Sequence, residues 1–432
     1  MARLLYTLLL LCIAPFVPVY LLWRARRQPD YLRHWAERGG CYARTLRPPE
    51  NTKTFWLHAV SVGETRATQP LVQHIRQRWP EHHILITHMT PTGRQTSLEL
   101  YGDADARITR VYLPYDFPWA MRRFLRHFRP RLGILMETEL WPNLIAECHA
   151  QRIPLILANA RLSEKSARNY ARFPQLTRET LSHLAAILAQ TAEDAERLTQ
   201  LGATARTLHI VGNVKFDITP PAEMLSRGQT WRHTWRTWSG KQRVLLAAST
   251  REGEEALILD AYQNHLTPDF LLVIVPRHPQ RFAEVTALST ARGLHTTQRS
   301  VSLDISSKTQ VLIGDSMGEL FAYYAAADIA FIGGSLLDYG CQNLIEACAV
   351  GVPVLIGPST YNFAEAARAA LACGAAQQID NADALFRRAA ASLTTSLTAP
   401  HEPAASAGAV FAAAHRGASA RTFTQIAAFI DD

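Results

Sequence analysis

Short apolar segments alternate with longer amphipathic segments along most of this chain, and this alternation strongly limits how it can fold. Seven candidate strands lie in the first half of the chain and five in the second, and most are separated by stretches long enough for a helix. Such spacing is typical of units in which a helix connects two parallel strands. The candidate strands are 54–59, 84–88, 110–113, 132–136, 154–158, 186–190 and 208–211, then 244–248, 271–275, 310–313, 329–332 and 354–356.

The N-terminal segment has a different character. The run from Leu4 to Trp23 contains no charged residue and is followed by Arg24, Arg26 and Arg27. Twenty helical residues span about 30 Å, which is enough to cross the apolar core of a bilayer. No small-residue cleavage site follows the run, which argues against a removed signal peptide. We therefore expect a membrane-anchoring helix, spanning or lying in the interface, with the main body on the cytoplasmic side of an inner membrane and the arginines against anionic membrane lipids.

The two sets of candidate strands predict two domains, since a chain of 432 residues with 48% hydrophobic residues can bury two cores. The expected fold class is α/β, with two Rossmann-like, doubly wound parallel sheets facing a cleft. This architecture suits a nucleotide-sugar glycosyltransferase of the GT-B type, although a fold does not by itself define a function. The expected boundaries are 1–45 for the anchor and a basic linker, 46–216 for the first domain, 217–241 for a Trp-rich linker and 242–432 for the second domain.

The positive charge of the chain is concentrated near its N-terminus. The net charge is +8, and the first 50 residues contribute +5 of it, from eight arginines against three acidic residues. A nucleic-acid-binding protein is expected to carry its basic residues on the folded domains, interleaved with aromatic side chains. We therefore expect no nucleic-acid partner.

The sequence offers little for a metal site. The six cysteines form no CxxC pair and no compact Cys/His cluster, which predicts reduced thiols. Asp103 and Asp105 have the DxD spacing that many glycosyltransferases use to bind a metal, but they lie ahead of a strand, in what is expected to be a solvated turn. The expectation is that no metal is bound.

The segment 54–79 contains the first candidate catalytic residue. It predicts a strand, a tight loop containing Ser61 and Gly63, and a helix from Ala67, with Glu64 at the end of the loop. Ligands of open α/β sheets bind at the carboxyl ends of the strands, where Glu64 is expected. An acidic residue at a helix start often only complements the helix dipole, which leaves both roles open. The dipole lowers the pKa of Glu64 and burial raises it, and the sequence does not decide between them.

Other strand ends carry further polar groups. Glu137 and Glu139 follow the strand 132–136, and Lys215 follows the last strand of the first set. A carboxylate and an ammonium at such positions could also form an ordinary salt bridge. In the second set, four segments that follow strands contain groups that suit a phosphate, namely glycines, an arginine or the start of a helix. Each segment alone could also be an ordinary turn. The segments are PRH at 276–278, GDSMGE at 314–319, GGS at 333–335 and QNLIE at 342–346.

At these residues the sequence resembles the 3-deoxy-D-manno-octulosonic acid (Kdo) transferases, which build the inner core of lipopolysaccharide. The resemblance covers nearly the whole chain, in order. The matching blocks are HAVSVGE at 58–64, MTPTGR at 89–94, YLPYD at 112–116, METELWPNL at 136–144, NARLS at 159–163, KFD at 215–217, VPRHP at 275–279, GDSMGEL at 314–320 and FIGGS at 331–335.

The resemblance implies an inverting glycosyltransferase that moves Kdo from CMP-Kdo to a lipid A precursor, lipid IVA, without a metal or other cofactor. It implies that Glu64 is the base and that Glu137 and Lys215 stabilise the transition state. Cys341-Gln342 replaces a Gly-His pair found in many relatives, so the contacts near Gln342 are not predicted. The implied CMP-binding residues are Pro276, Arg277, Met317, Gly318, Glu319, Asn343, Leu344, Ile345 and Glu346.

Two other functional classes stay open. A membrane-tethered nucleotide-binding protein without activity would need the phosphate-binding segments but not the three catalytic candidates together. A different enzyme on the same fold, such as a nucleotide-sugar epimerase or a peptidoglycan glycosyltransferase, would keep the cleft. The number of Kdo units transferred and the oligomeric state are not predicted.

Overall fold

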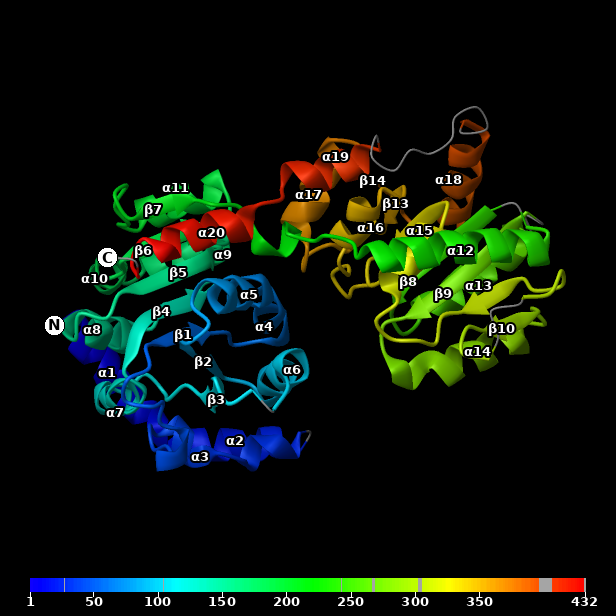
Figure 1. Ribbon diagram of the computed structural model, residues 1–432. Helices are drawn as coiled ribbons and strands as arrows, with labels where there is room; N and C mark the ends of the chain where they lie inside the picture. The colour runs from blue at the N-terminus through cyan, green and yellow to red at the C-terminus, as the bar shows by residue number, and fades with distance from the viewer. Residues whose placement is uncertain are drawn as a thin grey trace. The chain divides into compact units, whose positions relative to one another are not determined.

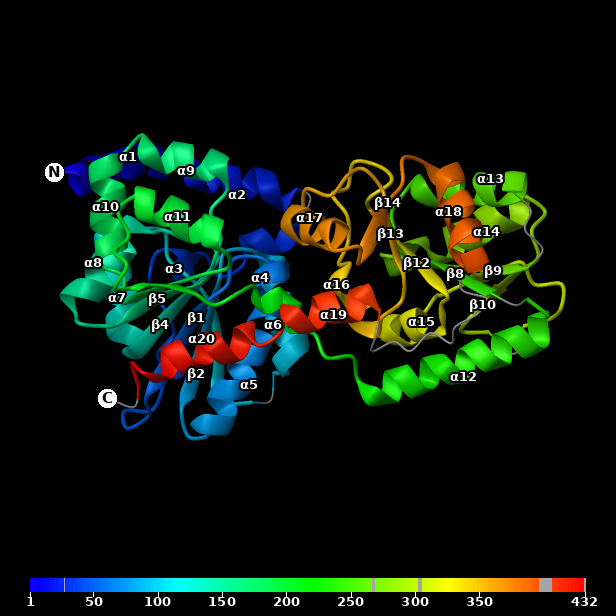
Figure 2. The ribbon, with the colours of Figure 1, turned by 90° about the horizontal axis from the view of Figure 1, so that it is seen from above.

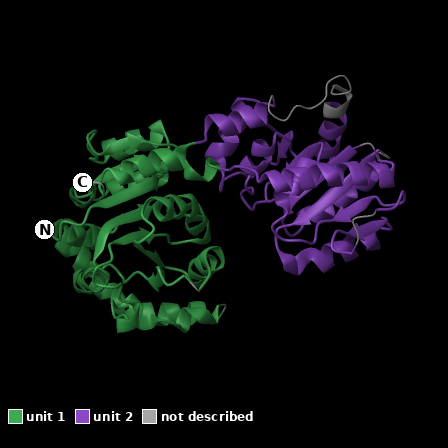
Figure 3. Ribbon diagram, viewed as in Figure 1, with its two compact units in different colours: residues 1–217, 417–432 green, residues 218–416 purple. Residues whose placement is uncertain are grey.

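The computed structural model describes residues 1–26, 28–103, 105–241, 243–265, 269–301, 305–395 and 406–430, with the side chains of 392–395 left out. The chain forms two compact units, each with its own sheet (Figure 3). Unit 1 consists of residues 1–217 and 417–432, and unit 2 of residues 218–416. Each sheet has seven strands, and every pair of neighbouring strands is parallel. The expected α/β class with two doubly wound sheets is confirmed.

The sheet of unit 1 has the strand order β3-β2-β1-β4-β5-β6-β7. Each strand overlaps one of the seven segments expected from the alternation of apolar and amphipathic stretches. Because the sheet is parallel, all seven carboxyl ends lie along the same edge, to which the candidate residues of this unit belong. The strands are β1 (Thr54–His58), β2 (His83–His88), β3 (Ile108–Tyr112), β4 (Pro130–Met136), β5 (Leu155–Ala160), β6 (Ala186–Ala189) and β7 (Leu208–Ile210).

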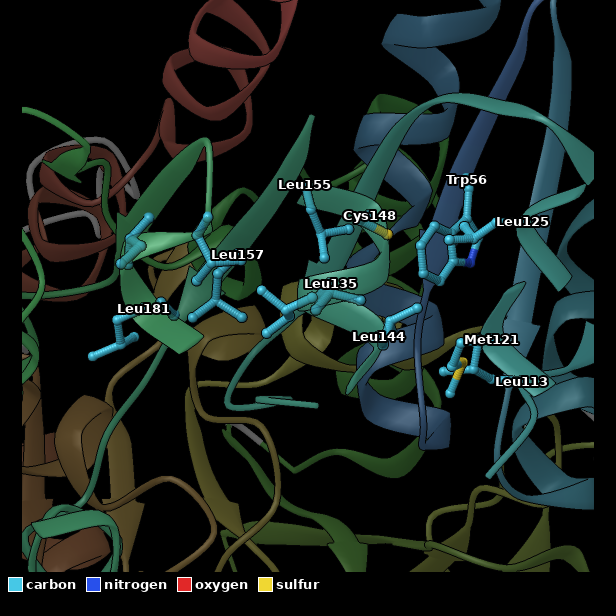
Figure 4. Packing of buried hydrophobic residues seen from close by; sticks show 14 of the residues in the cluster. Trp56, Leu113, Met121, Leu125, Leu135, Leu144, Cys148, Leu155, Leu157 and Leu181 are labelled. Carbon is cyan, nitrogen blue, oxygen red and sulfur yellow. The ribbon is translucent and has the colours of Figure 1, made fainter. Parts of the chain in front are cut away.

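Helices cover both faces of this sheet. Successive residues of β1 point to opposite faces, so each face presents apolar side chains that pack against helices. Phe55 and Leu57 lie in a cluster with α5 and α20, which run side by side (Figure 2), whereas Trp56 packs with α7 and α8 (Figure 4). Trp56 is fully buried. The helices are α3 (Trp35–Arg38), α4 (Val62–Ala67), α5 (Gln69–Arg78), α6 (Pro91–Tyr101), α7 (Pro118–Phe128), α8 (Pro142–Ala150), α9 (Glu164–Ala171), α10 (Pro174–Ser182), α11 (Ala192–Gln200) and α20 (Ala418–Ala427).

The sheet of unit 2 has the order β10-β11-β9-β8-β12-β13-β14. Its five inner strands were expected from the sequence, but the edge strands β10 and β14 were not. Both have three residues and contain TTQ and AQQ, so they lack the apolar run by which the others are recognised. The strands are β8 (Arg243–Thr250), β9 (Phe270–Pro276), β10 (Thr296–Gln298), β11 (Val311–Ile313), β12 (Ile329–Ile332), β13 (Val354–Ile356) and β14 (Ala376–Gln378).

The helices of unit 2 surround a second core. Ile258 and Tyr262 pack on the sheet beside Phe331 and Leu385, all of them buried. This core shares no residue with the clusters of unit 1, as expected for two domains. The helices are α12 (Ala222–Ser239), α13 (Glu254–His265), α14 (Phe282–Ala291), α15 (Leu320–Ala326), α16 (Ile345–Val350), α17 (Ala364–Ala372), α18 (Ala382–Thr395) and α19 (Ala407–Ala414).

Residues 217–241 are not the linker expected from their polar composition. They contain α12, which lies along α15 in unit 2 (Figure 1). Trp231 and Trp235 are buried, and their rings lie 5.0 and 6.3 Å from that of Tyr323. On the same helix, Arg232 and Arg236 pair with Asp328. The Trp-rich composition is therefore the inner face of a packed helix.

The boundary expected at the C-terminus is also wrong. Residues 417–432 were assigned to the second domain, but they return to unit 1, where Ile426 of α20 is buried beside α5. The carboxylate of Asp217 accepts hydrogen bonds from the backbone N–H groups of Gly417 and Ser419, and Arg421 donates to the carbonyl of Val211 at 2.9 Å. The start of α20 is thus tied to the last segment of the first half, 200 residues away in the sequence.

Gly228→Ala is expected to destabilise the protein, because α12 packs closely on α15. On helix propensity alone, alanine would stabilise an exposed site by about 1 kcal/mol. At residue 228 an added Cβ would meet the carbonyl oxygen of Ala322 at 2.3 Å and Cβ of Ala325 at 2.5 Å. Such overpacking costs about 1–3 kcal/mol, so urea unfolding should show a lower midpoint. The exposed neighbour Gln229→Ala is the control and should leave the midpoint unchanged or slightly raised; a stabilised Gly228→Ala would contradict this packing.

The N-terminal segment forms α1 (Ala2–Ile13), a short 3-10 segment (Ala14–Phe16) and α2 (Val17–Ala25). Together they form a stretch of 24 residues, Ala2–Ala25, that is long and apolar enough to cross a membrane. The segment also contacts unit 1, since the Thr7 hydroxyl lies 3.0 Å from the amide nitrogen of Asn143 on α8. Its exposed large hydrophobic residues are Leu4, Leu5, Leu8, Leu9, Leu11, Ile13, Phe16, Val19, Tyr20, Leu22 and Trp23.

Candidate active site

Glu64 lies on the first turn of α4, directly after β1. Ser61 caps this helix: its hydroxyl accepts from the backbone N–H of Glu64 at 3.3 Å and donates to Oε1 of Glu64 at 2.8 Å, while the N–H of Val60 donates to Oε2 at 2.7 Å. This arrangement is close to a capping box, in which the side chain of the residue three positions after the cap accepts a hydrogen bond at the cap. The helix starts at Val62 and not at Ala67 as expected. The cap fixes the orientation of the carboxylate.

Burial has the largest effect on the pKa of Glu64. Its side chain is 7% exposed. The loss of hydration raises its pKa to about 7, the hydrogen bonds from Val60 and Ser61 act against this rise, and the negative charges of Glu137 and Glu139 add to it. A carboxyl group with this pKa exchanges its proton at neutral pH, as a general base must.

Glu137 follows β4, the strand next to β1, which explains its electrostatic coupling to Glu64. Its backbone has a φ of 61°, a left-handed conformation that costs about 1–2 kcal/mol for a residue other than glycine. Nζ of Lys215 lies 2.7 Å from its Oε1, in a half-buried ion pair. Partly exposed ion pairs contribute about 0–1 kcal/mol to stability, so this pair does not offset the free-energy cost of the strained backbone. Strain of this kind is typical of functional sites.

Lys215 follows the last strand of the first half, as expected, although this strand is not a neighbour of the strand before Glu137. It follows β7, and two strands, β5 and β6, separate β7 from the β4 end that carries Glu137. The segment after β7 runs back towards Glu137 and contains a short 3-10 turn, Val214–Phe216. The structure thus brings the three sequence candidates of unit 1 to one part of the sheet edge, together with Glu139, whose pKa burial also raises and which accepts from Nε1 of Trp141 at 2.6 Å.

In unit 2, Arg277 follows β9 in a positively charged part of the sheet edge. Its Nε donates to Oε1 of Gln342 at 3.2 Å, so Gln342, whose contacts were left open, orients this guanidinium. His278 lies beside it, 3.0 Å from Arg251, and burial together with Arg251, Arg277 and Arg281 lowers its pKa. Such a cluster suits a phosphate group.

The glycines after β12 do not offer their N–H groups to a phosphate. The N–H of Gly333 donates to the carbonyl of Ala248 at 2.8 Å, and that of Gly334 donates to the buried carboxylate of Glu254 at 2.7 Å. A Cβ on Gly333 would lie 2.5 Å from the carbonyl oxygen of Ser249. These glycines therefore permit close backbone packing, which corrects the interpretation of this turn as a phosphate-binding segment.

The segments Met317–Glu319 and Asn343–Glu346 follow β11 and β12 at the same edge. Met317 and Gly318 are exposed, whereas Glu319 forms ion pairs with Arg227 of α12 and with Arg299 at 2.9 and 3.2 Å. The Asn343 side chain donates to the carboxylate of Glu346 at 3.0 Å. Leu344 and Ile345 are buried. Pro276 is the last residue of β9, so all the implied CMP-binding positions lie at strand ends of this sheet.

Sequence reasoning did not assign the partners that hold these candidates. The Ser61 cap could have been found, because S-x-x-E is the signature of a capping box. Arg227, Arg299 and Glu254 are far from their partners in the sequence and give no local signal. Among the described residues no group of three or more His, Cys, Asp or Glu could hold a metal ion, and Asp105 pairs with Arg107 at 3.1 Å.

Comparisons with known proteins identify the family of the chain. The family model described as 3-deoxy-D-manno-octulosonic-acid transferase (kdotransferase) matches residues 33–218. The chain is 43% identical to the 3-deoxy-D-manno-octulosonic acid transferase of Bordetella pertussis, covering 98% of each chain, and 37% identical to that of Haemophilus influenzae, covering 91% of each.

The solved structure of UDP-GlcNAc 2-epimerase from Neisseria meningitidis bound to UDP-GlcNAc resembles the chain with a TM-score of 0.54. At 13% sequence identity, over 88% of this chain and 99% of that one, this likeness concerns the GT-B-like fold alone. The identity to full-length transferases decides the family. The chain belongs to the 3-deoxy-D-manno-octulosonic acid (Kdo) transferase family and is a glycosyltransferase.

Proposed function

We propose that this protein transfers Kdo from CMP-Kdo to a hydroxyl group of the lipid A precursor lipid IVA, with inversion at the anomeric carbon. The observation that carries the proposal is the buried carboxyl group of Glu64, capped by Ser61 and with a pKa near 7. The relatives that the chain covers almost completely are named Kdo transferases, which supports Kdo as the transferred sugar.

On the acceptor side, Glu64 takes the proton of the attacking hydroxyl group. Its two oxygens already accept from Val60 and Ser61, and each has a further lone pair with which to accept the acceptor's proton. A single base suits direct displacement, in which the hydroxyl oxygen attacks the anomeric carbon as CMP leaves, so the configuration inverts. The proton ends on Glu64 and is released to solvent.

On the donor side, unit 2 holds the nucleotide. Arg277, oriented by Gln342, binds the phosphate of CMP, and Glu346, held by Asn343, is placed to accept from a ribose hydroxyl. Lys215 offsets negative charge on the donor, from either its sugar carboxylate or the departing phosphate. CMP carries one phosphate, so two cationic side chains suffice and no metal or other cofactor is required in this scheme.

The N-terminal apolar segment supports a membrane as the location of this reaction. Its exposed apolar side chains and the arginines that follow it suit the cytoplasmic face of the inner membrane, where the lipid acceptor and anionic head groups are present. We propose this location for the protein, with membrane lipid as a partner.

The test is an assay of the full-length protein in detergent with CMP-Kdo, with and without lipid IVA. We expect CMP release that depends on lipid IVA, a lipid product heavier by one or more Kdo residues in mass spectrometry, and an inverted anomer by NMR. Release of CMP without a lipid product, or transfer from UDP-sugars only, would overturn the proposal in favour of a hydrolase or of another enzyme on this fold.

A further inference from the structure

We propose that Asn159 is a positioning residue that brings Lys215 to Glu137, a role that rests on the proposed function of this site. Asn159 lies near the end of β5 and is fully buried. Its side chain accepts a hydrogen bond from the backbone of Val214, so it acts on Lys215 through the segment that carries this lysine.

The order of the strands creates the need for such a residue. Glu137 follows β4 and Lys215 follows β7, with β5 and β6 between them. Neighbouring strands lie about 4.8 Å apart, so the two strand ends are separated by roughly 14 Å. The ammonium group nevertheless lies 2.7 Å from the carboxylate. The chain after Val211 must therefore run back across the ends of β6 and β5, and something must hold it there.

Asn159 makes one of the contacts that hold this segment, in addition to those of Val211 and Asp217 with the start of α20. Its Oδ1 accepts a hydrogen bond from the backbone N–H of Val214, the residue before Lys215, at 3.1 Å. Directly after the neighbouring strand β6, Gln190 donates from Nε2 to the carbonyl of Asn159 at 2.9 Å and is also buried. The side chain of Asn213 then accepts from the N–H of Lys215 at 2.9 Å, which closes the turn.

The backbone of Asn159 is adapted to this task. Its φ is 52°, a left-handed conformation in which asparagine is enriched over most residues but which still departs from the regular strand. Glu137, on the neighbouring strand end, has a φ of 61°. Two adjacent strand ends thus carry residues with left-handed backbones. Glu137 bears the carboxylate of the ion pair, and Asn159 holds the segment that contains Lys215.

Asn159→Gly separates the hydrogen bond from the backbone conformation. Glycine adopts positive φ without strain, so the strand end is kept while the contact with Val214 is lost. Lys215 is then expected to spend more time away from Glu137. Gln190→Met is the matched control, because it removes a buried hydrogen bond to Asn159 of similar length but leaves the bond to Val214 in place.

The first measurement needs no substrate. The chain contains five lysines, at 53, 165, 215, 241 and 308, so acetylation by an amine-reactive ester can be followed at each by peptide mass spectrometry. We expect Asn159→Gly to increase the acetylation rate of Lys215 about three- to tenfold, the range set by one lost hydrogen bond, with unchanged rates at Lys165 and Lys241. Gln190→Met should leave Lys215 near the wild-type rate. An unchanged rate in Asn159→Gly, or an equal increase in the control, would overturn the proposal.

The second measurement is a double-mutant cycle in the transfer assay. Asn159→Gly is expected to lower kcat about tenfold while KM for CMP-Kdo stays within twofold. In a Lys215→Met background the same substitution should not lower kcat further, because Asn159 acts only through Lys215. Losses that multiply would show an independent structural role and overturn the proposal. If the wild type does not transfer Kdo at all, the proposed function fails, and the acetylation experiment still decides whether Asn159 positions Lys215.

Discussion

Glu64→Gln is expected to lower kcat for Kdo transfer by about 10²- to 10⁴-fold, the range attributed to a general base, while the dissociation constant for CMP stays within twofold. Glutamine has nearly the same shape and can still accept from Val60, but it cannot accept the proton of an attacking hydroxyl group. The measurements are initial rates of lipid product formation and calorimetric titration with CMP.

Glu139→Gln is the matched control for this variant. Glu139 is a second carboxyl group at the same sheet edge whose pKa burial raises, but it accepts from the indole of Trp141 and an amide oxygen can replace it there. We expect kcat within about fivefold of the wild type, since only its influence on the charge near Glu64 is lost. Near-normal turnover by Glu64→Gln, or equal losses in both variants, would remove Glu64 as the base.

The rate of the wild-type enzyme should also depend on pH through Glu64. The base must be ionised, and its pKa is about 7. Below this value kcat is therefore expected to fall towards tenfold for each pH unit, and above it this group should no longer limit the rate. The residual rate of Glu64→Gln should not show this decrease at low pH, the acidic limb of the pH profile. A limb centred near the ordinary glutamate value in the wild type would contradict the burial of this carboxyl group.

The same pKa predicts a cost in stability. Because the folded state holds the proton of Glu64 more tightly than the unfolded chain, the free energy of unfolding falls as pH rises from about 4.5 to about 7. A shift of this size corresponds to about 3 kcal/mol. Glu64→Gln does not titrate, so its stability relative to the wild type should rise by that order between pH 4 and pH 8 in denaturant unfolding. Parallel stability profiles would contradict this.

Lys215→Met is expected to lower kcat about 10²- to 10³-fold, as found when a group that stabilises developing charge is removed. Methionine keeps most of the apolar stem, so the change isolates the ammonium group. Its loss also leaves Glu137 without its 2.7 Å partner. The unneutralised charge of Glu137 should then raise the pKa of Glu64 further and move the acidic limb of the rate to higher pH. Rates of transfer between pH 5 and pH 9 measure both effects.

Lys53→Met is the control, because Lys53 lies just before β1, at the opposite edge of the same sheet. It is exposed, and its loss should change neither kcat nor the position of the acidic limb. A small loss in Lys215→Met without a shift of the limb would mean that Lys215 only forms a surface ion pair, the alternative left open by the sequence.

The candidate residues were predicted better than the contacts that hold them. Glu64, Glu137 and Lys215 follow strands in the sequence, and a parallel sheet brings such positions to one edge. The sequence did not predict that burial dominates the pKa of Glu64, nor that the charges of Glu137 and Glu139, which are far away in the chain, add to its rise. It likewise gave no sign that Glu319 is held by Arg227 and Arg299.

Helix α12 and the C-terminal residues also show which features the sequence predicts and which it does not. The sequence by itself determined twelve of the fourteen strands that the structure describes, their parallel arrangement and the apolar N-terminal segment, because hydrophobic periodicity is a local property of the chain. Only the tertiary structure decided that Trp231 faces inwards, that residues 417–432 return to unit 1 and that Lys215 crosses two strand ends to reach Glu137. Those outcomes depend on contacts between residues 78 or more positions apart in the chain, and no local sequence pattern records the free energies of such contacts.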